Sequence, residues 1–73
     1  MEILGKTSLQ DYDAVWFRYN NLEYGINENF DPDTLMCDGS NCDNINDSSN
    51  AWIATLIKAK VEKFGGVRMV PWI

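Results

Sequence analysis

The stretch VWFRYNNLEYGI, residues 15–26, decides the fold because it has the pattern of a β-hairpin. It predicts two strands closed by the turn Asn20-Asn21, and asparagine tolerates the positive φ that two-residue hairpin turns require. The cross-strand pairs expected on one face are Tyr19 with Leu22, Phe17 with Tyr24 and Val15 with Ile26. Those expected on the other face are Arg18 with Glu23 and Trp16 with Gly25. A shift of one residue would destroy every match, so the register is well specified.

Three further elements are expected around the hairpin. Residues 2–9 predict a short first strand, although their alternation is poor. A helix over about 49–64 is predicted by an apolar stripe at helical spacing, which ends at a pair of glycines. Residues 67–73 predict a closing strand at a sheet edge, because Pro71 cannot donate a ladder hydrogen bond. The expected fold class is α+β, with an antiparallel sheet of three or four strands and one helix on one face, in a single domain over residues 1–73.

The composition argues against several functions. The 73-residue chain has a net charge of −5 and no histidine. Without histidine, neither a catalytic triad nor His-based acid–base chemistry is available, so we predict no catalytic residue, no cofactor and no metal site. The negative charge disfavours direct binding to nucleic acid or to an anionic membrane. No leader pattern opens the chain and no apolar run approaches the ~20 residues of a membrane span. We therefore expect a cytoplasmic protein, in the host cytoplasm if the gene is viral.

The two cysteines, Cys37 and Cys42, admit three states. Their spacing suits half of a zinc site, but the chain has no second pair of ligands to complete it. A disulfide between them is geometrically allowed. An intracellular location favours free thiols, which is the expected state. The run that begins at Asp38 resembles calcium loops only in composition, because its sixth position is Asp43 where such loops have glycine and its twelfth is Ser49 where they have glutamate.

Acidic side chains are concentrated in the connection between the hairpin and the helix. Residues 27–50 carry six acidic and no basic side chains, whereas residues 51–73 carry four basic and one acidic. A connection this long in a small domain is usually functional or mobile. Two interpretations stay open, namely a solvated loop that keeps the protein soluble and a surface that binds a basic partner. The acidic candidates for partner binding are Glu28, Asp31, Asp33, Asp38, Asp43 and Asp47.

Two tryptophans complete the candidate binding residues. Trp16 lies on the hairpin face away from the predicted helix, where it either covers Gly25 or contacts a partner as an aromatic anchor. If the strand over residues 67–73 joins the same sheet, Val70 and Trp72 extend this aromatic patch.

We therefore expect a small acidic domain that binds protein without catalysing a reaction. The leading hypothesis is an inhibitor or modulator that occupies a basic, nucleic-acid-facing surface of a partner such as a nucleic-acid-binding enzyme or complex. Spaced carboxylates imitate a phosphate backbone electrostatically, and a viral or mobile-element protein that takes over a host or blocks its defences suits this description. The second hypothesis is a homodimer or larger homo-oligomer that associates through the sheet edge and the aromatic face. The third is a small metal-responsive domain that uses Cys37, Cys42 and nearby aspartates.

Overall fold

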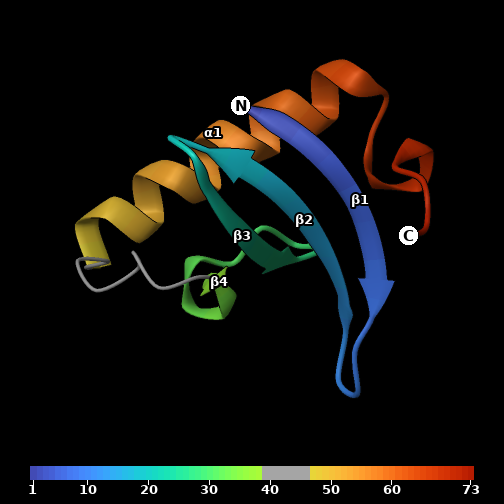
Figure 1. Ribbon diagram of the computed structural model, residues 1–73, viewed down its shortest axis with the longest axis horizontal. Helices are drawn as coiled ribbons and strands as arrows, with labels where there is room; N and C mark the ends of the chain where they lie inside the picture. Colours follow the sequence, from blue (N-terminus) through green and yellow to red (C-terminus); the bar gives the residue numbers. More distant parts are fainter. Residues whose placement is uncertain (39–46) are drawn as a thin grey trace.

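The computed structural model describes residues 1–38 and 47–73, with side chains for residues 1–37 and 49–73. The described strands are β1 (Glu2–Ser8), β2 (Asp13–Tyr19), β3 (Leu22–Asn27) and β4 (Met36–Asp38). The described helices are α1 (Asp47–Phe64) and two short 3₁₀ helices, η1 (Pro32–Thr34) and η2 (Val67–Met69). The strands form one antiparallel sheet in the order β1-β2-β3-β4, and α1 lies across one face of it (Figure 1). The predicted α+β class is confirmed.

The hairpin has the predicted register. Strands β2 and β3 pair Tyr19 with Leu22 next to the turn, and the five predicted pairs are all present. Asn20 and Asn21 have φ values of 53° and 65°, so both turn residues adopt the left-handed conformation that the sequence indicated. The predicted first strand is also present as β1, paired with β2 along the other edge of the hairpin.

The core lies between α1 and the sheet face that carries the three apolar pairs. Phe17 is fully buried, and its ring stacks on that of Tyr24 with the centroids 5.4 Å apart. The helix contributes the buried residues of its apolar stripe, whereas Phe64 at the end of the stripe is 54% exposed. The buried apolar side chains that form this cluster are Val15, Phe17, Tyr24, Ile26, Ile53, Ala54, Ile57, Val61 and Val70.

The C-terminal segment differs from the strand predicted over residues 67–73. Gly65 and Gly66 have φ values of 129° and 97°, and the amide of Gly66 donates to the carbonyl of Val61 at 2.8 Å, which ends α1. The chain then turns through η2 instead of extending. Only Trp72 forms a bridge, parallel to β1 rather than antiparallel. Because the chain turns through η2 at Val67–Met69, only this bridge remains of the predicted strand.

A bulge in β1 brings a lysine into the protein interior. Ile3 pairs with Phe17 but Gly5 pairs with Trp16, so one extra residue lies between them. Lys6 follows the bulge and is only 7% exposed. Its ammonium donates to the carbonyl oxygen of Val67 at 2.9 Å and lies 4.6 Å from the centre of the Trp72 ring. The lysine therefore attaches the C-terminal segment to the edge of the sheet.

The expectation of a free thiol is wrong for Cys37, which is disulfide-bonded. This residue lies in β4 opposite Tyr24, against the core. Cys42, the other cysteine of the sequence, lies outside the described residues. A sulfur in a disulfide is not a thiolate ligand, which removes Cys37 from the metal-responsive hypothesis.

Candidate protein-binding surfaces

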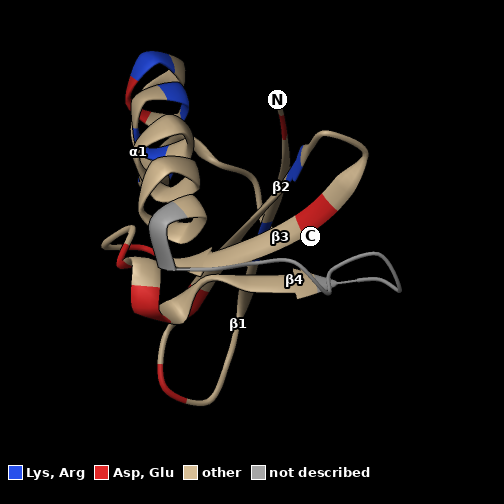
Figure 2. Ribbon diagram, turned by 90° about the vertical axis from the view of Figure 1, so that its left-hand side faces the viewer, with Lys and Arg blue, Asp and Glu red and all other residues tan. Residues whose placement is uncertain are grey.

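Exposed carboxylates gather at the end of the sheet opposite the hairpin turn. The pairing of Ala14 with Asn27 brings the β1–β2 connection beside the segment that follows β3. Figure 2 shows acidic positions in both of these segments, while most basic positions lie towards the C-terminal part of α1. We call this surface the acidic end; it comprises Asp11, Asp13, Glu28, Asp31 and Asp33, of which only Asp13 is half-buried.

Hydrogen bonds fix the backbone of the acidic end after β3. Asp31 caps η1 by accepting from the amide of Asp33 at 3.1 Å, and its own amide donates to the side chain of Asn27 at 2.9 Å. Thr34 accepts from the amide of Asn27 at 3.1 Å through its hydroxyl, which donates to the carbonyl of Asp31 at 2.7 Å. Phe30 has a positive φ of 56° and packs against the core. This turn therefore presents its carboxylates on a fixed frame.

None of the carboxylates of the acidic end forms an ion pair with the described residues. The recorded ion pairs join Arg18 to Glu2 and to Glu23, on the open face of the sheet. Carboxylates that form no ion pair within the described part of the chain can attract a basic partner.

Of the remaining predicted acidic residues, only Asp38 can be placed relative to this cluster. Asp38 pairs with Glu23 in the sheet, which places its backbone towards the hairpin turn and away from Glu28. Asp43 lies outside the described residues, and Asp47 is the first residue of α1. Conversely, the sequence reasoning missed Asp11 and Asp13. The register itself was a usable signal, because the Val15–Ile26 pair extends to Ala14 and Asn27, the residues that Asp13 precedes and Glu28 follows.

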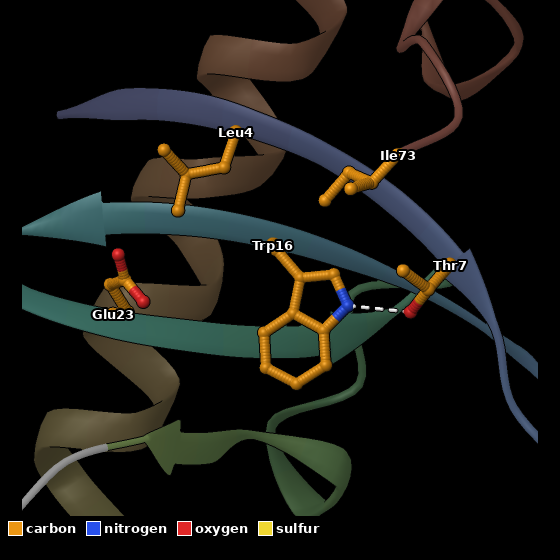
Figure 3. A pocket seen from close by; sticks show the side chains of 5 residues that line it. All are labelled: Leu4, Thr7, Trp16, Glu23 and Ile73. Atoms are coloured by element: carbon orange, nitrogen blue, oxygen red, sulfur yellow. Dashed lines mark hydrogen bonds between the residues drawn. The ribbon is translucent and has the colours of Figure 1, made fainter.

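A second candidate surface is the sheet face that α1 leaves open. It holds a hollow of about 250 Å³ lined by Leu4, Thr7, Trp16, Glu23 and Ile73 (Figure 3). The indole nitrogen of Trp16 donates to the hydroxyl of Thr7 at 2.7 Å, which holds the ring across the strands. Ile73 is 75% exposed at the rim.

Trp16 also covers Gly25, which is the first of the two interpretations that the sequence left open for this residue. A Cβ atom built on Gly25 would lie 2.7 Å from the Trp16 ring, so the indole lies flat over the glycine. The next row across the sheet is charged, with Arg18 donating to Glu2 at 2.8 Å and to Glu23 at 2.9 Å. The hydrogen bond to Glu23 and the negative charge of Glu2 raise the pKa of Arg18.

The aromatic patch of Trp16, Val70 and Trp72 is not formed. Val70 is 1% exposed and belongs to the core, while the Trp72 ring lies over the ammonium of Lys6. Ile73 lies beside Trp16 instead, at the end of the segment that bridges to β1 in parallel through Trp72. Trp72 remains 59% exposed.

Comparisons with known proteins identified no relative of this chain. The chain matches no protein-family model, no curated protein and no solved structure. Within the part of the chain that the structure describes, no helix combines the length and apolar character needed to cross a membrane.

Proposed function

We propose that this chain is a non-catalytic protein-binding domain whose acidic end occupies a basic surface of a partner, of the kind that otherwise binds nucleic acid. The observation that carries the proposal is the acidic end itself, where five carboxylates gather without an ion-pair partner among the described residues. Three of them, Glu28, Asp31 and Asp33, lie on a turn held by its own hydrogen bonds.

The rigidity of the turn favours binding over a merely solubilising role. A loop that serves only to keep a protein soluble needs no fixed conformation, yet this turn uses Asn27, Asp31 and Thr34 to fix its own backbone. Side chains on a prearranged backbone lose less conformational entropy when a partner binds. Charge of one sign also speeds the encounter with a surface of the opposite sign.

Affinity capture tests this function. The chain is used to capture proteins from the cell that produces it, or from the host cell if the gene is viral, and the retained proteins are challenged with duplex DNA, with RNA and with salt. The expected partner binds nucleic acid and is released by the competing nucleic acid and by high salt. The variant Glu28→Gln/Asp31→Asn/Asp33→Asn should no longer retain it.

The substitutions are chosen to leave the fold intact. Asparagine caps helices as well as aspartate does, so Asp31→Asn keeps an acceptor for the amide of Asp33. Glu62→Gln is the matched control for Glu28→Gln, because Glu62 is an exposed glutamate on α1 outside the acidic end. Equal retention of the partner by the triple variant and the wild type would overturn the proposal.

A homo-oligomer that associates through the open face is the second candidate, favoured by the hollow beside Trp16 and by the exposed Ile73. Apolar association of this kind persists at high salt, whereas binding through the acidic end weakens. Sedimentation of the wild type and of Trp16→Ala at low and high salt separates the two. A dimer that resists salt and is lost in Trp16→Ala would favour this second candidate.

A further inference from the structure

The C-terminal part of α1 carries a hollow of opposite character to the acidic end. It has a volume of about 300 Å³ and lies between the helix and the hairpin end of the sheet. We call it the lysine groove; it is lined by Met1, Tyr19, Leu56, Ala59, Lys60 and Lys63. Its surface therefore combines apolar side chains with two ammonium groups.

A second hollow adjoins the lysine groove. It measures about 220 Å³ and is lined by Lys60, Lys63 and Phe64, so the two hollows share both lysines. Phe64 is the last residue of α1 and is 54% exposed. Each side of the lysine pair thus offers apolar surface to a ligand.

The two lysines have no acidic partner among the described residues, whose ion pairs all involve Arg18. Lys60 and Lys63 are three positions apart on a helix, and like charges at such spacings repel each other. A carboxylate placed between them would relieve this repulsion. The complementary ligand is therefore an anion with apolar groups on both sides of its charge.

We propose that the lysine groove docks an acidic segment of a partner protein, one in which a carboxylate side chain lies between two apolar side chains. Ala59, Lys60 and Lys63 are exposed, so the groove is shallow. A shallow groove suits a peptide lying across it better than an acyl chain, which needs enclosure. This surface is separate from the acidic end and opposite in charge, so the inference stands whether or not the proposed function holds.

The first test uses a short fluorescein-labelled peptide with leucines on both sides of a central pair of glutamates, and follows its fluorescence anisotropy. Binding to the wild type should weaken as salt rises. The same peptide with glutamines in place of the glutamates should bind more weakly. Lys60→Gln/Lys63→Gln should lose about tenfold in affinity, the expected scale for two exposed charge pairs. Lys58→Gln, on the same helix but outside both hollows, should change it by less than about twofold.

A second pair of variants tests the position of the site. Ala59→Glu introduces a carboxylate beside the two lysines and should block the peptide, while Ala51→Glu places the same charge on an exposed position of α1 outside the groove and should not. Circular dichroism checks that both variants fold. Absence of peptide binding to the wild type would overturn the proposal, as would an equal loss in Lys58→Gln or Ala51→Glu. Lysine-dependent binding of dodecanoate without binding of the peptide would overturn it in favour of an anionic amphiphile.

Discussion

The two faces of the β2–β3 hairpin are built from alternate residues of the same strands, yet they are stabilised in different ways. On the face below α1, Phe17 and its neighbours are fully buried in a continuous core. On the open face, Trp16 is held by one hydrogen bond and by its contact with Gly25, and Arg18 by two exposed ion pairs. The covered face therefore contributes most of the stability of the fold, while the open face contributes only through a few individual contacts. Substitutions on the covered face should therefore lower the free energy of unfolding more than those on the open face.

The largest effect is expected from Phe17→Ala on the covered face. Removing a fully buried phenylalanine leaves a cavity and costs about 3–5 kcal/mol. In a domain this small, that loss approaches the whole free energy of unfolding. Urea denaturation of the wild type and the variant measures it. A loss below about 1 kcal/mol would show that the covered face does not dominate stability.

Gly25→Ala should have an intermediate effect on the open face. The new methyl group overlaps the Trp16 ring, which must move and lose its hydrogen bond to Thr7, at a cost of about 1–3 kcal/mol. In a Trp16→Ala background the same substitution should cost nothing, because the ring that opposes it is gone. Denaturation of the two single variants and the double variant forms a thermodynamic cycle. Equal costs of Gly25→Ala in both backgrounds would contradict the contact.

Lys6→Met tests the attachment of the C-terminal segment at the sheet edge. Methionine keeps an apolar chain of similar length but cannot donate to the carbonyl of Val67, so the expected loss is about 1–2 kcal/mol. The fluorescence of Trp72 should change as well, since its ring lies over the ammonium. Lys58→Met is the matched control at an exposed position and should stay within about 0.5 kcal/mol of the wild type. A Lys6→Met variant as stable as this control would refute the role of Lys6.

The smallest expected effect is a change in the stability of the fold with pH, which arises on the covered face. Burial raises the pKa of Tyr24, so the folded state holds this proton more tightly than the unfolded state does. Its contribution to stability is complete below the unfolded pKa of about 10 and is lost as the pH rises through the higher folded pKa. Tyr24→Phe removes this titration, so its stability should decline less above about pH 10 than that of the wild type. Parallel alkaline profiles, followed by circular dichroism, would contradict the assignment.

The hairpin could be predicted residue by residue because the residues that determine it are close together in the sequence. The Asn20-Asn21 turn fixes the register, and every facing pair confirms it. The C-terminal end of α1 was also predictable from local sequence, since the glycines after Phe64 end the helix, whereas its first residue is Asp47 and the prediction began at about residue 49. The same register also indicates that Asp13, and the connection that holds Asp11, lie at the end of the sheet opposite the turn. Neither residue was included in the predicted site.

The errors arose where tertiary contacts outweighed the local pattern. The apolar alternation after Gly66 resembled a strand, but Val70 is buried in the core and η2 precedes it. Lys6 was not expected inside, because its burial depends on the bulge at Gly5 and on a carbonyl that lies 61 positions away in the sequence. The state of Cys37 was predicted from the expected compartment and not from geometry, and this prediction was wrong.

Binding through the acidic end is tested by the rate at which the captured partner associates with it. Surface plasmon resonance compares the wild type with Glu28→Gln/Asp31→Asn/Asp33→Asn at low and high salt. We predict association about tenfold slower for the variant at low salt, a flatter salt dependence of the association rate and little change in the dissociation rate. Association rates that are equal for the two proteins at both salt concentrations would contradict this prediction.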